Sequence, residues 1–388
     1  MPDSTPTRRA YAVGALFFVN GMTFSNWLPR IPEVRDKLHI SNGTLGTTLI
    51  GMGLGGFVGS LLVGKAMSRL GSRRLLLIAA TMLALFLPLI AVAPNAASLG
   101  LVLFALGCAD VFNDMAMNAQ GVMAQQDLGR SIMNRLHGTW SLGFTCGAGI
   151  GLIASATHLA IGPHLAGITV VLLIAILLVR NELDPNDREA APAAAGSRRS
   201  LGLVILAIGA MAFAISPMES VPTDWSAVLL RDVFHAGRIA GTGTVVFAAT
   251  MMIGRLVGDH VLERVGPDRL LTGAMTIWAI GMLIVVTAPT GVVAVIGYAV
   301  AGLGVSVIFP QLYARAATLP GVSAGAGLGA MGFGQRLGFL AAPLLVGNLA
   351  DAHGLRVAIA SVAVGCLIVV GTARRYTHPS PGAAAEIA

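Results

Sequence analysis

Apolar runs long enough to cross a bilayer recur along the whole chain, separated by short polar turns. A helix needs about 20 mostly apolar residues to span the hydrocarbon layer. The first run carries Asn20, Asn26 and Pro29 and is followed by no small-residue cleavage site, so we interpret it as a retained membrane helix and not a signal peptide. The pattern predicts twelve membrane helices, at 11–31, 44–66, 73–93, 97–122, 136–157, 162–180, 200–220, 239–260, 269–288, 291–314, 324–349 and 356–374.

A single long polar stretch interrupts the apolar runs near the middle of the chain. Residues 181–199 combine charges with Pro, Ala and Gly, which is typical of a flexible linker. The linker separates six predicted helices within 1–180 from six within 200–388, so we expect an all-α integral membrane protein made of two six-helix bundles. The tripeptide Leu-Gly-Phe recurs at matching depth in both halves, at 142–144 and 337–339. Such weak internal symmetry is expected of parallel repeats.

Composition supports a membrane protein, and charge predicts its orientation. The chain is 55% hydrophobic and 11% charged, values that exclude an ordinary soluble domain. If the N-terminus is cytoplasmic, the outer segments carry few of the 25 Lys and Arg residues, namely Arg30, Arg35, Lys37, Arg231, Arg238 and Arg356. This positive-inside bias predicts a multi-pass protein of the plasma (inner) membrane with both termini in the cytoplasm. The net charge of +7 therefore reflects topology, and we expect no nucleic-acid partner.

A polar stripe interrupts the predicted helix 97–122. Asp110, Asp114 and Asn118 are spaced four residues apart, which places them on one helical face. An ionisable side chain in the bilayer costs roughly 2.5–3.5 kcal/mol on insertion scales, so it is usually retained for a function or a partner. We therefore interpret Asp114 and Asp110 as proton-coupling carboxylates that face a path wetter than lipid.

The alternative for these two acids is a static role. Arg336 lies in the middle of the predicted helix 324–349, where its charge needs a carboxylate or a water-filled cavity, and Arg315 is the second candidate cation. Either arginine could pair permanently with Asp110 or Asp114 and simply hold helices together.

Other polar groups in the predicted helices are candidate solute ligands. They comprise amides, one acid, one guanidinium and one indole, at Asn26, Asn113, Asn118, Gln120, Glu219, Trp225, Gln311, Gln335 and Arg336. Pro217 and Pro222 flank Glu219 and predict a broken or kinked helix, and discontinuous helices often line the substrate path of a carrier. The alternative places Glu219 and Asp224 at the outer membrane surface and Trp225 in the aromatic belt.

One histidine and three tryptophans are interpreted as structural residues. His137 lies where the predicted helix 136–157 enters the membrane, and such a His more often caps or hydrogen-bonds than titrates. Trp27, Trp140 and Trp278 are interpreted as packing or interface anchors. The Cys spacing matches no metal pattern, and nothing resembles a nucleophile–base pair. We therefore expect no metal, no cofactor and no enzymatic activity.

After the second predicted helix the chain reads GKAMSRLGSRR, at 64–74. This run resembles the signature loop of the major facilitator superfamily, in which a glycine and an acid precede Gly-Arg-Arg/Lys. In the second half Gly258, Asp259 and Gly266 echo the loop, and Arg255 lies one turn before Asp259 as a plausible ion-pair partner. The resemblance implies a cytoplasmic gate between the halves at Gly64, Arg69, Gly71, Arg73, Arg74, Arg255 and Asp259. The alternative is that these residues supply positive-inside charge only.

Within that superfamily, the run from Asp114 to Asn118 resembles the acid-x-Ala-x-Asn pattern of fucose-permease-like sugar–proton symporters and related bacterial permeases. The resemblance implies that Asp114 couples proton movement to solute movement. We therefore expect a secondary transporter for a small polar, sugar-like solute, working by proton symport and alternating access, with sodium ions as the alternative coupling ion. We expect it to work as a monomer in the lipid bilayer.

Two other functions stay open at this point. An exporter of drugs or amphipathic metabolites by proton antiport would favour an aromatic-rich cavity, whereas only 6% of the residues are aromatic. A non-transporting sensor or scaffold would normally carry an added soluble domain, and no polar segment here is long enough to form one.

Overall fold

The computed structural model describes residues 5–130, 132–184, 202–317 and 324–377, and all regular structure within these ranges is helical. The first half contains α1 (Pro6–Ser25), η1 (Leu28–Arg30), α2 (Ile31–Leu38), α3 (Asn42–Phe86), α4 (Leu89–Val92), α5 (Ala96–Leu128), α6 (Met133–Ala156) and α7 (Ile161–Val179). The second half contains α8 (Gly202–Asp232), η2 (Gly237–Ile239), α9 (Thr242–Val265), α10 (Pro267–Thr287), α11 (Gly291–Val305), α12 (Ile308–Ala317), α13 (Ala324–His353) and α14 (Leu355–Thr377).

Every predicted apolar run falls on one or more of these helices, which confirms the all-α membrane fold class. Within the described ranges, nine runs are both long and apolar enough to cross a membrane. One of the nine, Asn42–Val92, holds two predicted helices. The long helices α1 and α13 are not among the nine, and both carry polar side chains that belong to the site described below.

Two tight turns, one in each half, share the same backbone geometry. Gly71 has φ 76° and ψ 160° inside α3, at the point where the two predicted helices of that run meet. Gly266 has φ 78° and ψ 163° between α9 and α10. A positive φ of this kind is strained for residues with a Cβ, so glycine is required at both turns. The two turns occupy the same place in the helix order of each half, as expected of a repeat.

Of the broken or kinked helix predicted around Pro217 and Pro222, the break is wrong, because α8 runs without interruption from Gly202 to Asp232, and the kink stays a prediction. Pro222 lacks an N–H group and so leaves the carbonyl of Met218 without its helical donor. The indole N–H of Trp278 on α10 donates to that carbonyl over 3.0 Å. A neighbouring helix therefore supplies the missing hydrogen bond, which is how prolines are tolerated in membrane helices.

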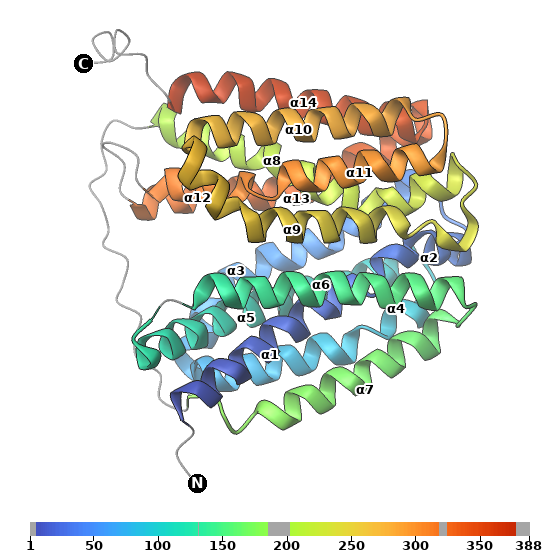
Figure 1. The fold of residues 1–388 in the computed structure, drawn as a ribbon. Helices are drawn as coiled ribbons and strands as arrows, with labels where there is room; N and C mark the ends of the chain where they lie inside the picture. The colour runs from blue at the N-terminus through green and yellow to red at the C-terminus, as the bar shows by residue number, and fades with distance from the viewer. Residues whose placement is uncertain (1–4, 131, 185–201, 318–323, 378–388) are drawn as a thin grey trace, which may run out of the picture.

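The helices are arranged as two groups that lie side by side (Figure 1). Helices α1–α7 form one group, called here the first bundle, and α8–α14 form the second bundle. The start of α1 and the end of α14 lie at one end of the molecule, the termini end, and α2 lies at the opposite end, the α2 end. The predicted linker at 181–199 lies outside the described residues from position 185 onward.

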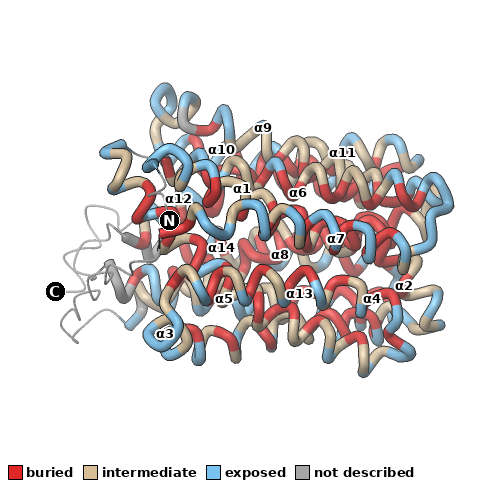
Figure 2. The backbone as a smooth tube through the Cα atoms, turned by 90° about the horizontal axis from the view of Figure 1, so that it is seen from below, coloured by how far each residue is buried: buried red, intermediate tan, exposed pale blue. Residues whose placement is uncertain are grey.

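Close backbone contact joins helices both within and between the bundles. A Cβ placed on Gly55 of α3 would lie 1.9 Å from the carbonyl oxygen of Phe104 on α5, so only glycine permits this approach. Near the α2 end, a Cβ on Gly46 of α3 would lie 2.2 Å from the carbonyl oxygen of Pro343 on α13. Buried residues concentrate where helices face one another, and exposed ones lie on the outer faces (Figure 2). Those outer faces include large apolar side chains such as Leu61 and Leu178, as a protein in lipid requires.

Candidate functional site

A hydrogen-bonded group in the first bundle surrounds Asp110. The side-chain amide of Asn20 on α1 donates to the Asp110 carboxylate on α5 over 3.1 Å. The indole N–H of Trp140 on α6 donates to the Asn20 carbonyl oxygen over 2.7 Å. Asn20 is only 6% exposed, so its two bonds fix the amide orientation and tie three helices together.

Asp114, one turn further along α5, faces the second bundle. The charged groups that act on its carboxylate are His137 of α6 and Arg336 of α13, and the Tyr313 hydroxyl of α12 is also within its field. Asn118 donates to Asp114 Oδ1 over 3.0 Å. Asp114, His137 and Arg336 are all exposed, so the space between them is reached by solvent although it lies between two bundles.

Further charged residues connect His137 to the second bundle. His137 also lies in the field of Arg255 on α9. The Arg255 guanidinium pairs with Glu219 of α8 over 3.5 Å and donates to the Ser141 hydroxyl of α6 over 3.3 Å. A row of ionisable groups therefore runs from Asp114 through His137 and Arg255 to Glu219, with the two acids at its ends, and it crosses from one bundle to the other.

The two arginines considered as static partners for the helix-α5 acids lie in different settings. Arg315 pairs with Asp268 of α10, inside the second bundle. Within the described residues, Arg336 lies beyond ion-pair distance of Asp114 and acts on it only through space. Next to Arg336, Gln335 accepts a hydrogen bond from the Tyr313 hydroxyl.

Three of the candidate amides are held inside the first bundle. Asn26 is fully buried, where it donates to the Met22 carbonyl and faces His164. Gln120 is 1% exposed, and its amide bonds the Ser72 hydroxyl and both backbone groups of Asp184. These contacts give Asn26 and Gln120 structural partners away from Asp114. Asn113 is also buried, but its carbonyl oxygen has no partner among the described residues.

The remaining candidates lie in the second bundle. Trp225 is completely buried, so it does not belong to an exposed aromatic belt, and its indole N–H has no partner among the described residues. Gln311 is half-buried on α12. Glu219 is paired with Arg255 as described above.

The residues proposed as a cytoplasmic gate lie around the Gly71 turn of α3 and on α9 or at its end. Arg73 donates to the carbonyl of Arg180 in its own bundle, and Arg69 and Arg74 are exposed. Gly64 has open space around it. The side chain of Asp259 lies outside the described residues, so its pairing with Arg255 stays a prediction.

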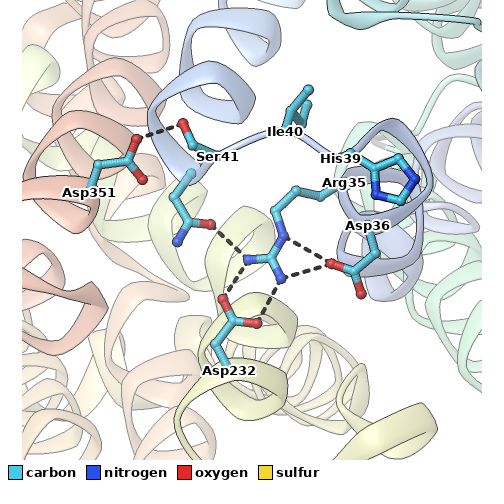
Figure 3. A pocket seen from close by; sticks show the side chains of 8 residues that line it. Arg35, Asp36, His39, Ile40, Ser41, Asp232 and Asp351 are labelled. Carbon is cyan, nitrogen blue, oxygen red and sulfur yellow. Dashed lines mark hydrogen bonds and ion pairs between the residues drawn. The ribbon is translucent and has the colours of Figure 1, made fainter.

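An ion-pair cluster joins the two bundles at the α2 end (Figure 3). Arg35 of α2 makes a two-pronged contact with Asp232 of α8, at 2.5 and 2.7 Å, and Arg231 pairs with Asp36 at 2.6 Å. These four residues are called here the α2-end cluster. The hydrogen bonds that Arg35 donates to Asp232 raise the pKa of Arg35 above its usual value, so the pair stays charged. Asp351 of α13 adds a third link by accepting from Ser41 and from the Gly43 N–H.

Several of these site residues had a signal in the sequence and others had none. Asn20 is a polar residue in an apolar run, which marks it as unusual. The structure places His137 in the field of Asp114 and brings Trp140 to Asn20, which bonds Asp110, and no local pattern indicates these contacts. Arg35 and Asp232 of the α2-end cluster are 197 residues apart in the chain, and no local pattern connects them.

Known proteins resemble this chain over nearly its whole length. The model of the family described as Major Facilitator Superfamily matches residues 13–236. An uncharacterized MFS-type transporter of Yersinia pestis is 31% identical over 373 residues, covering 93% of this chain and 94% of that protein. The membrane protein MosC of Rhizobium meliloti is 28% identical, covering 95% of this chain and 90% of MosC.

Solved structures show the same fold at low sequence identity. A mutant of the nucleoside transporter NupG superposes with a TM-score of 0.77 at 14% identity, covering 95% of this chain and 100% of NupG. A bacterial homolog of the human lysosomal transporter Spinster, in an inward-facing and unoccupied conformation, gives a TM-score of 0.76 at 11% identity, covering 97% of this chain and 99% of that one.

Proposed function

Because this chain belongs to the Major Facilitator Superfamily and is a membrane transporter of that type, we propose that it carries a small polar, sugar-like solute across the plasma membrane by proton symport. The observation that carries the proposal is the setting of Asp114. Its carboxylate is exposed between the two bundles and lies in the field of cationic or titratable groups from both of them, Arg336 and His137.

The physical basis for coupling is the change in charge at Asp114. The ionised carboxylate attracts Arg336 across the bundle interface, and a bound proton removes that attraction. Protonation therefore alters the interaction energy between the bundles, which is what a coupled carrier needs in order to change its conformation. Asn118, Gln335 and Tyr313 supply neutral donors and acceptors beside the carboxylate that suit the hydroxyl groups of a sugar-like solute.

The arrangement of contacts supports alternating access with one end closed. The α2-end cluster and Asp351 tie the bundles together at the α2 end, whereas Asp114 and His137 are exposed. We assign both termini to the cytoplasm from the positive-inside bias. With that orientation the conformation described here is closed to the outside and open to the cytoplasm.

The proposal is tested by reconstituting the purified protein in liposomes and imposing a pH gradient on radiolabelled sugars, polyols and nucleosides. We expect gradient-driven accumulation of at least one solute by the wild-type protein. Asp114→Asn should abolish the accumulation and keep solute counterflow, because only the proton step is removed. Glu263→Gln, a change of an exposed acid at the end of α9, is the matched control and should leave both activities intact.

Two results would contradict the proposal. Full accumulation by Asp114→Asn would show that this carboxylate carries no coupled proton. Solute accumulation in the liposomes only when the proton gradient is directed out of the liposome lumen would indicate antiport, and hence export, instead of symport.

A further inference from the structure

One face of α8 combines an acid with polar groups that lack partners. Ser220, Asp224 and Arg231 are four and seven residues apart, and at 100° per residue they fall on the same side of the helix. Arg231 identifies that side, because it pairs with Asp36 of α2 in the first bundle. Ser216, one turn before Ser220, packs against α13, since a Cβ on Gly338 would lie 2.7 Å from the Ser216 Cβ. Ser220 and Asp224 therefore lie between the contact of α8 with α13 and its contact with α2.

Asp224 lies inside the molecule, below the closed α2 end. At a rise of 1.5 Å per residue, its position is roughly 10 Å along α8 from Arg231, toward the middle of the membrane span. The helix from Val204 to Asp232 is one of the runs able to cross a membrane, so Asp224 is an acid within a span. The side chain is half-buried.

The carboxylate of Asp224 has almost no partner in the structure. Within the described ranges, its one hydrogen bond comes from the neighbouring Thr223 hydroxyl at 3.5 Å, and it makes no ion pair. The nearby cations are engaged elsewhere, since Arg255 pairs with Glu219 and Arg231 with Asp36. An acid in a membrane span without a partner is costly and indicates a functional site.

Unsatisfied groups next to Asp224 point to a missing ligand. Ser220 is 6% exposed, and its hydroxyl has no partner among the described residues. The indole N–H of the fully buried Trp225 also lacks one there. Buried polar groups are nearly always hydrogen-bonded in folded proteins. A buried orphan hydroxyl on the same helix face as an unpaired carboxylate is therefore the second, independent sign of a site.

The chemistry of this pair selects the ligand. Asp224 offers two acceptor oxygens and one negative charge, and the Ser220 hydroxyl, which has no partner among the described residues, offers a further acceptor oxygen. A primary ammonium group carries three N–H donors and one positive charge, and so satisfies both side chains at once. We propose that Asp224 and Ser220 bind the ammonium group of an amine-bearing solute. The inference rests on the proposed function in one respect only, which is that Asp224 and Ser220 lie on the pathway of a transported solute.

The test compares amines with their hydroxyl counterparts by calorimetric titration of the full-length protein in detergent. The probe pairs are glucosamine with glucose, ethanolamine with ethylene glycol, and 2-amino-1-butanol with 1,2-butanediol. We expect at least one amine to bind the wild-type protein about tenfold more tightly than its counterpart, the ratio expected for gaining a charge-assisted hydrogen bond. The preference should disappear in Asp224→Asn and shrink in Ser220→Ala.

Controls separate this site from the proton-coupling site. Asp114→Asn should keep the amine preference, so loss of coupled transport in that variant leaves the present inference intact. Ser220→Ala makes a small change and provides the test if Asp224→Asn fails to fold, as judged by size-exclusion chromatography. The inference is overturned if no amine binds the wild-type protein better than its hydroxyl counterpart. It is equally overturned if the preference survives unchanged in a folded Asp224→Asn or Ser220→Ala variant.

Discussion

The guanidinium of Arg30 is almost completely buried in the first bundle, with 1% exposure. It pairs with Glu33 at 2.6 Å and donates to the Leu159 carbonyl at 2.7 Å. Its contact with His164 at 3.1 Å requires the imidazole nitrogen to accept, so His164 is neutral and can donate from its other nitrogen to Asn26. One buried cation thus fixes the orientation of the end of α1 relative to α7.

At the scale of single residues, we predict that Glu33→Gln destabilises the folded protein by about 3 kcal/mol, because removing one partner leaves a buried charge uncompensated. Burial opposes the charged form of Glu33, but hydrogen bonds from Arg30 and Ser155 outweigh it and lower the pKa of this carboxyl. A lowered pKa in the folded state stabilises the protein above the unfolded-state pKa of about 4.3. This stability is lost as the pH falls through the folded-state pKa.

Thermal unfolding in detergent, followed from pH 7 down to pH 3, checks this prediction. The difference in unfolding free energy between the wild-type protein and Glu33→Gln should be constant near neutral pH and shrink below pH 4. An exposed acid, Glu263, provides the control, since Glu263→Gln should stay within about 0.5 kcal/mol at every pH. A difference that does not depend on pH would exclude this ion pair as the source of the stability.

At the scale of elements, the continuity of α8 depends on a donor from α10. Trp278 donates to the Met218 carbonyl that Pro222 leaves free, and the bond is buried. We predict that Trp278→Phe costs about 3 kcal/mol, from an unsatisfied carbonyl together with lost packing. In a Pro222→Ala background the helix supplies its own N–H donor, so Trp278→Phe should cost about 1 kcal/mol less there.

A double-mutant cycle on unfolding free energies measures this coupling. The four proteins are the wild type, the two single variants and the double variant. Strictly additive costs would show that the indole does not compensate for the proline, and that Trp278 acts through packing alone.

Some parts of the fold and of the candidate site can be predicted from the sequence and others cannot, for physical reasons. Apolar runs and the spacing of Asp110 and Asp114 are local patterns, and a helix converts them directly into spans and faces. The continuity of α8 past Pro222 cannot be predicted from the local sequence, because its compensating donor is 60 residues away from the carbonyl it serves. The surroundings of Asp114 were only partly predictable, since Arg336 was recognised as a candidate partner while Tyr313 and His137 reach it only through folding.

At the scale of the whole molecule, ion pairs join the two bundles at the α2 end, beside the backbone contact of Gly46. We predict that Arg35→Asp shifts the protein toward a conformation open at that end, because it places like charges where Arg35 and Asp232 now attract. Distances between spin labels at Lys37 and His235 should lengthen and broaden in this variant.

A charge swap provides the control for this experiment. The double variant Arg35→Asp with Asp232→Arg restores opposite charges and should bring the distance distribution back toward that of the wild-type protein. If the single variant leaves the distances unchanged, the ion pairs do not hold this end closed. The backbone contacts of Gly46 and the hydrogen bonds of Asp351 would then account for the closure.

Placing the charged links between the bundles at one end makes that end responsive to the ions around it. Electrolyte screens charges over about 8 Å at physiological ionic strength and about 3 Å at 1 M. Arg231 and Asp36 are each about one-third exposed, so added salt reaches them readily. Concentrated salt on the α2 side alone would weaken the closure there and leave the apolar contacts unaffected. The protein would therefore respond to salinity on one face of the membrane, before any solute binds.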